Sequence, residues 1–151
     1  MENKNKNNWA SFIHLSTLSQ YFIPFGNYIF PILIWSTKKE KSDFIDYNGK
    51  QVLNFQLSVF LYSLVLGLIA VPIILIAIFS TISLNTFIND GNFIFNILKI
   101  ENSSGFIIVA LVALFLFVSL KVAEFLLIIY ASLKTANGEK YKYPLTLSFI
   151  K

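Results

Sequence analysis

The chain has 151 residues, of which 56% are hydrophobic and only 13% are charged, and its formal net charge is +4. Ordinary soluble domains carry about 25% charged residues, so a soluble fold of this length could not cover so much apolar surface. The lack of cysteine excludes disulfides and thiolate chemistry, and basic residues that are all lysine argue against nucleic-acid recognition. We therefore expect one membrane domain whose main partner is the lipid bilayer.

The first eight residues are polar, and we expect them to be disordered. Residues 9–35 are mostly apolar, but Pro24 and Pro31 interrupt them, with Gly26 and Asn27 in between. Because proline removes a backbone donor and clashes with the preceding turn, this pattern predicts a helix, a break near Pro24 and a second helix. The segment either crosses the membrane once or re-enters as a hairpin, and the sequence leaves both forms open.

Residues 37–50 form a strongly charged connection, in which Asp46 is placed to cap the next helix. The second apolar stretch, residues 52–83, exceeds the roughly 20 residues that cross the hydrocarbon core. It can therefore span the membrane with tilt, and Pro72 is placed to kink it.

Residues 85–105 form a polar-interrupted connection whose spacing predicts a short helix lying in the membrane interface. Residues 106–133 are a third apolar segment, long enough to span, and Gly138 is a turn or helix stop in the tail. The predicted fold is all-α, a small transmembrane helix bundle in a single domain over residues 9–151. It combines a Pro-broken N-terminal helix or hairpin, two long transmembrane helices and the short interfacial helix.

Lysine placement predicts the orientation, since short loops rich in lysine stay cytoplasmic. If residues 9–35 cross once, the 37–50 loop and the tail carry eight lysines against three on the other side. If they re-enter, the split becomes ten to one, with Lys121 counted as intramembrane. Both forms predict a multi-pass protein of the inner (cytoplasmic) membrane with loop and tail in the cytoplasm.

Polar residues inside the apolar segments are the candidate site. Asn54, Ser58 and Tyr62 follow helical spacings on one stripe, and Lys121 and Glu124 lie three residues apart on the third segment. From matching depths we expect Glu124 to accept a hydrogen bond from one of the first three, with Lys121 either neutralising it or extending toward a polar surface. We favour hydrogen bonding between helices as the role of this cluster, over a substrate path or a proton relay.

The sequence contains no constellation that predicts catalysis, a cofactor or a metal. His14 is the only histidine and has no acidic residue within one helical turn, so a hydrogen-bonded histidine is favoured over a metal ligand. We expect aromatic side chains at four positions to anchor the membrane interface: Trp9, Trp35, Tyr141 and Tyr143.

Three blocks of sequence resemble a bacterial membrane family of unknown function. They are His14-Leu15-Ser16 followed by residues 21–27 with Pro31 and Trp35, residues 44–46 with 49–56, and residues 136–139 with 143–145. The residues that carry the likeness are His14, Pro24, Gly26, Asn27, Gly49, Asn54, Asn137, Gly138 and Pro144. This family often has histidine where the chain has Asn48, which weakens any role that rests on an imidazole at that position.

The resemblance extends distantly to the twenty-kilodalton membrane subunit of the chloroplast inner-envelope protein translocon. It implies a channel or protein-translocation component as the alternative function, with oligomerisation, because three helices cannot enclose a wide pore. The leading expectation is a non-enzymatic scaffold or subunit of a membrane assembly, whose partners are lipid and either itself or other membrane proteins.

Overall fold

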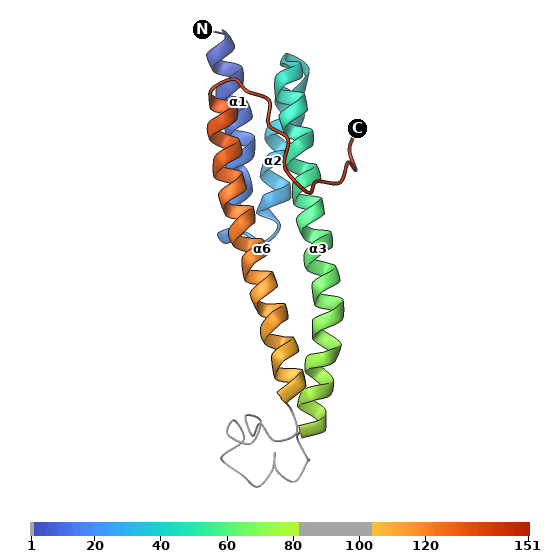
Figure 1. The fold of residues 1–151 in the computed structure, drawn as a ribbon. Coiled ribbons are helices and arrows are strands. Elements are labelled where there is room, and N and C mark those ends of the chain that lie inside the picture. Colours follow the sequence, from blue (N-terminus) through green and yellow to red (C-terminus); the bar gives the residue numbers. More distant parts are fainter. Residues whose placement is uncertain (1, 82–103) are drawn as a thin grey trace. The chain divides into compact units, whose positions relative to one another are not determined.

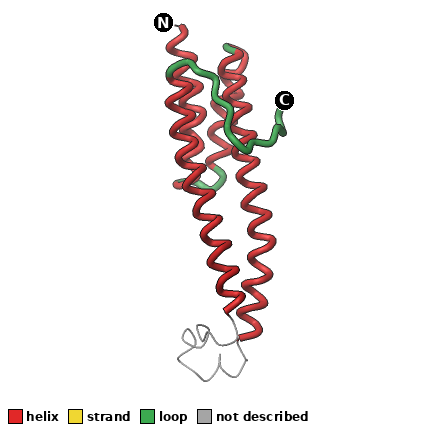
Figure 2. The backbone as a smooth tube through the Cα atoms, viewed as in Figure 1, coloured by secondary structure: helices red, strands yellow, loops and turns green. Residues whose placement is uncertain are grey.

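The computed structural model describes residues 2–81 and 104–151. In chain order the elements are α1 (Glu2–Ser16), the 3-10 helix η1 (Thr17–Tyr21), α2 (Gly26–Lys38), the 3-10 helix η2 (Lys39–Lys41), α3 (Asp43–Thr81) and α6 (Ser104–Ala136). Helices and loops make up this described part, without strands, which confirms the predicted all-α class (Figures 1 and 2). The predicted interfacial helix lies largely in residues 82–103, outside the described residues.

The chain divides into two compact units, and α3 and α6 each contribute to both. Unit 1 comprises residues 2–61 and 120–151, and unit 2 comprises residues 62–119. Unit 1 therefore holds α1, α2, the first half of α3, the end of α6 and the C-terminal tail.

The N-terminal segment of unit 1 is a helical hairpin. In Figure 1, α1 and α2 run antiparallel, and the ammonium of Lys38 lies 4.2 Å from the centroid of a Trp9 ring. The start of the chain and the end of α2 therefore lie at the same end of unit 1, so this segment doubles back. Since α1 begins at Glu2, the prediction of a disordered start was wrong for the described residues. The amide of Asn7 donates to the carbonyl of Ala136, which ties this polar helix to α6.

The break between the two hairpin helices lies where the first proline predicted it. The carbonyl of Ser19 accepts hydrogen bonds from the backbone of Phe22 and Ile23, and Phe25 adopts φ 60°. Gly26 then opens α2 so close to Ser19 that an added Cβ would lie 2.8 Å from the Ser19 carbonyl carbon. A residue with a side chain would therefore push the two arms of the hairpin apart.

The charged connection is shorter than the sequence suggested, because helical structure occupies most of residues 37–50. Ser42 caps α3, accepting a hydrogen bond from the backbone N–H of Phe44 at 3.2 Å. The prediction that Asp46 caps the helix was wrong. Asp46 lies in the first turns of α3, where it accepts a hydrogen bond from the indole of Trp35 and pairs with Lys50.

Within the described residues, two helices are long and apolar enough to cross a membrane, over Asp43–Leu75 of α3 and Ile108–Ala136 of α6. Each has a mean hydropathy of 2.5 in its most apolar window, and only 11% of each window is buried within the protein. The core helix of a soluble protein passes the same length and hydropathy test but is mostly buried. Exposed apolar surface on both helices therefore favours contact with lipid.

The hydrophobic core of unit 1 gathers buried side chains from α1, α3, α6 and the tail. Its buried members are Ile13, Ile45, Val52, Phe55, Val59, Ile128, Ala131 and Tyr143. The half-buried Trp35 packs against this core, and Gly49 of α3 provides room for its indole ring. The core holds the polar groups described below in fixed positions between the helices.

Candidate functional site

Unit 1 buries polar side chains as well as its hydrophobic core. Nine polar residues are at most 5% exposed: His14, Thr17, Asn48, Asn54, Gln56, Ser58, Glu124, Ser132 and Thr135. Buried polar groups cost free energy unless they are hydrogen-bonded, so their partners show what the arrangement does.

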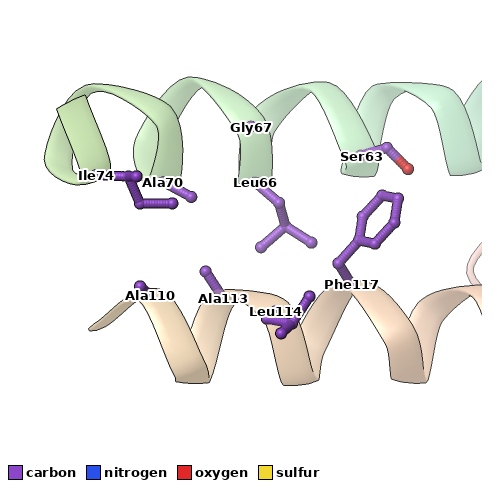
Figure 3. Close-up of a pocket in the computed structure, with 9 residues that line it drawn as sticks. All are labelled: Ser63, Leu66, Gly67, Ala70, Ile74, Ala110, Ala113, Leu114 and Phe117. Atoms are coloured by element: carbon purple, nitrogen blue, oxygen red, sulfur yellow. The ribbon is translucent and has the colours of Figure 1, made fainter. Parts of the chain in front are cut away.

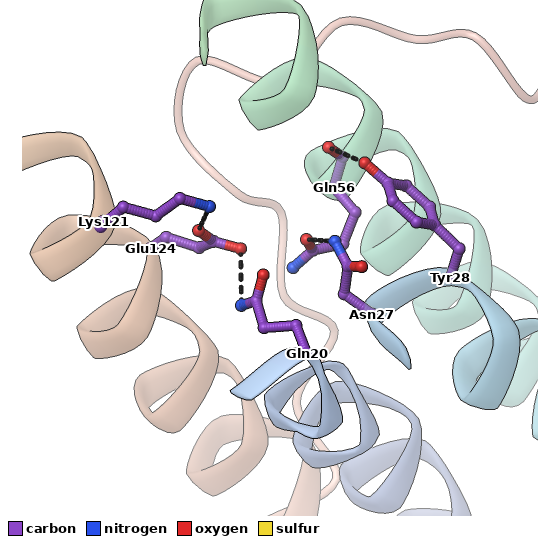
Figure 4. Close-up of polar contacts among 6 residues, drawn as sticks. All are labelled: Gln20, Asn27, Tyr28, Gln56, Lys121 and Glu124. Carbon is purple, nitrogen blue, oxygen red and sulfur yellow. Dashed lines mark hydrogen bonds and ion pairs between the residues drawn. The ribbon is translucent and has the colours of Figure 1, made fainter. Parts of the chain in front are cut away.

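Glu124 is the buried acid at the centre of this polar interior. One carboxylate oxygen accepts from the Lys121 ammonium at 2.8 Å, and the other accepts from the Gln20 amide at 3.0 Å (Figure 4). The pairing with Lys121 was predicted correctly. The expected bond from Asn54 or Ser58 was wrong, because the tip of the hairpin supplies the amide instead. Tyr62 belongs to unit 2, and its contact with Glu124 stays a prediction.

A second set of polar bonds joins the start of α2 to α3. The Asn27 amide donates to the side-chain oxygen of Gln56 at 2.8 Å, and the Tyr28 hydroxyl donates to the Gln56 backbone carbonyl at 3.1 Å (Figure 4). The side-chain nitrogen of Gln56 is buried and has no hydrogen-bond partner in the described part of the chain. Gln20 and Asn27 thus fasten the hairpin tip to α6 and α3.

His14 is fully buried and bonds through both ring nitrogens. Its Nδ1 lies 2.7 Å from the Tyr143 hydroxyl, and its Nε2 lies 3.3 Å from the side-chain oxygen of Asn48. The Asn48 amide donates to the Phe44 carbonyl, so the oxygen of Asn48 must accept, and the imidazole carries its proton on Nε2. Burial raises the pKa of Tyr143 well above its usual value, so the phenol stays protonated and donates to Nδ1. The prediction of a hydrogen-bonded histidine is confirmed.

Tyr143 joins the C-terminal tail to the core. Its ring stacks on Phe55, with centroids 4.0 Å apart, and meets Tyr141 edge-on at 5.0 Å. Because Tyr143 is only 2% exposed, the expectation that it anchors the membrane interface was wrong. Its role in this structure is to hold the tail against α1 and α3.

Asn54 and Ser58 bind the backbone of the tail. The side-chain oxygen of Asn54 accepts from the N–H groups of Phe149 and Ile150, and its amide donates to the Ile150 carbonyl. Ser58 accepts from the N–H of Leu147 at 2.9 Å and donates to the Asn54 carbonyl. The tail is not helical, so its backbone N–H and C=O groups have no partners within a helix, and these two side chains supply them.

Replacing Asn54 by leucine should free the tail while keeping a side chain of similar size. Two N–H groups and one carbonyl of the tail lose their partner, each at a cost of about 1–3 kcal/mol if they stay buried. We expect limited trypsin digestion after Lys142 to accelerate at least about tenfold. Gln51→Leu is the matched control, because the buried side-chain oxygen of Gln51 has no hydrogen-bond partner in the described part of the chain. Equal cleavage rates in both variants would show that Asn54 does not hold the tail.

The comparison with known protein families covers almost the whole chain. Residues 5–150 match the MamF/MmsF family, described as the magnetosome magnetite crystal formation protein family. The chain belongs to this family. No curated protein and no solved structure matches it. Membership of MamF/MmsF, together with two exposed apolar helices, identifies a helical membrane protein.

The family assignment confirms the resemblance to a bacterial membrane family but not its distant extension to the chloroplast translocon. Within this MamF/MmsF chain, the residues that suggested the likeness lie at structural joints. Asn137 and Gly138 end α6, with their N–H groups bonded to carbonyls of its last turns, and Pro144 precedes Leu145 at φ 55°. Gly26 and Gly49 stand where neighbouring side chains or backbone leave no room for a Cβ.

Unit 2 of this MamF/MmsF protein has an apolar groove of about 220 Å³ between α3 and α6 (Figure 3). Its lining comprises Ser63, Leu66, Gly67, Ala70 and Ile74 of α3, and Ala110, Ala113, Leu114 and Phe117 of α6. The Ser63 hydroxyl is buried without a hydrogen-bond partner in the described residues. None of the lining side chains is titratable near neutral pH, so the groove offers no acid or base for chemistry.

Sequence reasoning missed Gln20 and Gln56 as members of the polar interior. Each is an amide within a mostly apolar segment, which was the available signal. Among residues 2–81 and 104–151, no three His, Asp or Glu side chains gather in a way that could hold a metal ion.

Proposed function

We propose that this chain is a non-enzymatic integral membrane protein that acts as a scaffold or subunit of a larger membrane assembly. The observation that carries the proposal is the use of the polar interior of unit 1. Its bonds join hairpin, α3, α6 and tail to one another, as those of Gln20 with Glu124 and of Asn54 with Ile150 illustrate. Polar groups that are hydrogen-bonded to one another in this way specify one arrangement of the helices. Among the described residues they leave no nucleophile and base placed together for catalysis.

The family is described by its part in magnetite crystal formation. Direct binding to such a mineral would require carboxylates that are free to bind iron. In the described part of the chain, Asp46, Glu124 and Glu139 are each paired with a lysine. Glu40 and Asp43 are exposed and form no ion pair among the described residues, so we propose only that this chain belongs to the membrane assembly in which such a process takes place. A channel or protein-translocation component remains the alternative, with no support from the comparisons.

We further propose that the α1–α2 hairpin re-enters the membrane from the cytoplasmic side. The 13 residues of α2 extend about 20 Å, which is too short for the roughly 30 Å hydrocarbon core. At the hairpin tip, Phe22 is 88% exposed and Phe25 is 70% exposed, as suits side chains in contact with lipid. Both chain ends and the lysines of residues 37–50 then share the cytoplasmic face.

Cysteine labelling in intact cells tests this topology on a chain that has no cysteine of its own. Single cysteines at Lys4, Glu40 and Ser148 should all resist a membrane-impermeant maleimide until the cells are permeabilised. A cysteine at Asn102, expected on the opposite side, serves as the positive control. Labelling of position 4 alone would indicate a single crossing, and labelling of all three would reverse the orientation.

Photo-crosslinking in native membranes tests the proposed function. A photoreactive phenylalanine analogue at Leu68 or Phe115, which are 67% and 71% exposed, faces the surroundings of unit 2. A scaffold should give a few discrete protein adducts that recur between preparations. Adducts with lipid alone at both positions would contradict a role in a protein assembly.

A further inference from the structure

A basic cavity lies at the end of unit 1 where the two hairpin ends meet the start of α3. It has a volume of about 180 Å³, and its lining includes Asn5, Lys6, Trp9, Lys38, Lys41 and Ser42. These residues come from the first turns of α1, the end of α2 and the residues that lead into α3. Three cationic side chains from separate elements therefore border one hollow.

The three lysines of this cavity have no carboxylate partner, which is also true of Lys4, Lys39, Lys140, Lys142 and Lys151 among the described residues. Elsewhere, Lys50, Lys121 and Lys134 each contact a carboxylate. Among the described residues, no carboxylate lies within 4.0 Å of the ammonium groups of Lys6, Lys38 or Lys41. Like charges around one cavity repel one another, and an anion bound between them would relieve that repulsion.

Two further features favour an anion. The cavity adjoins the N-terminus of α3, a 39-residue helix whose dipole favours negative charge, although Asp43 and Asp46 already lie in its first turn. The N–H groups of Phe44, Ile45 and Asp46 are bonded to Ser42, so they are not available to a ligand. Ser42 accepts from the N–H of Phe44, so its own hydroxyl hydrogen is free to be donated. The Lys38 ammonium also rests over the Trp9 ring, which holds its stem beside the cavity.

An apolar path leads away from the cavity along α1. The Trp9 ring contacts Phe12 at a centroid distance of 6.4 Å, and Phe12 is 58% exposed. Spacings of four and three residues place Asn5, Trp9 and Phe12 on one face of the helix. We propose that this cavity binds the phosphate headgroup of an anionic phospholipid, with an acyl chain running along Trp9 and Phe12.

Lipid binding to the purified full chain tests the proposal. Native mass spectrometry in detergent, with equimolar dioleoyl phosphatidylglycerol and phosphatidylcholine, should show preferential retention of the anionic lipid. The double variant Lys6→Gln/Lys41→Gln should lower phosphatidylglycerol affinity by about thirtyfold, since each lysine near an anionic headgroup contributes about 1 kcal/mol. The matched control Lys4→Gln/Lys39→Gln removes the same charge outside the cavity and should change that affinity less than about threefold.

The outcomes separate a lipid site from its alternatives. If both double variants lose the same affinity while circular dichroism shows unchanged helix content, binding depends on the overall surface charge, and the proposed site is wrong. Equal retention of the two lipids by the wild-type chain would overturn it as well. A parallel titration with inorganic phosphate covers the free anion, and complete displacement of phosphatidylglycerol at millimolar phosphate would contradict a lipid as the ligand.

Discussion

Replacing Gly49 by alanine should lower the free energy of unfolding by about 1–3 kcal/mol, the usual cost of overpacking a filled interior. A Cβ at this position would lie 2.2 Å from Cδ1 of Trp35. The indole cannot simply move aside, because its N–H donates to Asp46 at 3.0 Å and its ring packs against the core. Unfolding of the purified chain in mixed micelles with increasing SDS, followed by circular dichroism, measures the change.

Gly67 provides the matched control on the same helix. Nothing lies within 4 Å of a Cβ built there, so Gly67→Ala should be neutral or stabilise the helix by up to about 1 kcal/mol. If Gly49→Ala unfolds at the same SDS fraction as Gly67→Ala, the close contact between Gly49 and Trp35 does not contribute to stability.

Removing the carboxylate of Glu124 should have the second large effect. Glu124→Ala leaves Lys121 and Gln20 without their acceptor, and breaking a buried ion pair costs about 3–5 kcal/mol. The Lys121 side chain is 36% exposed and can turn outward, so we expect about 2–3 kcal/mol. Glu124→Gln keeps a hydrogen-bonding group in place and should cost only about 0.6–2 kcal/mol.

The same SDS titration separates these two variants. A glutamine variant as unstable as the alanine variant would show that the negative charge itself, and not hydrogen bonding, holds the hairpin tip against α6. Such a result would also reopen a role for a titratable carboxyl group in this protein.

Local signals in the sequence predicted the parts of the fold that depend on nearby residues. Pro24 predicted the break in the hairpin because a proline disrupts the helix in which it lies. The pairing of Lys121 with Glu124 was predictable because residues three apart share a helix face. The two long apolar helices were also predictable, because their length and composition can be recognised from their own sequence.

Contacts between distant segments could not be read in this way. Matching depth suggested that Ser58, Tyr62 or the nearby Asn54 bonds to Glu124. Depth does not reveal that a non-helical tail lies against the face of α3 that carries Asn54 and Ser58. Asn54 and Ser58 bond to the backbone of the tail, because that backbone needs hydrogen-bond partners, whereas Glu124 accepts a hydrogen bond from the Gln20 amide at the hairpin tip. Likewise, the polar composition of the first residues suggested disorder. The hydrogen bond from Asn7 to Ala136 joins residues at opposite ends of the chain, so it could not be predicted from the local sequence.

We propose that the polar interior of unit 1 serves structure and not passage through the membrane. Flux measurements on liposomes that contain the purified chain, with protein-free liposomes as the reference, test it most directly. We expect proton and potassium fluxes equal to those of the protein-free liposomes, in the wild-type chain and in Glu124→Gln alike. A proton flux that appears with the wild-type chain and disappears in a folded Glu124→Gln variant would contradict the claim.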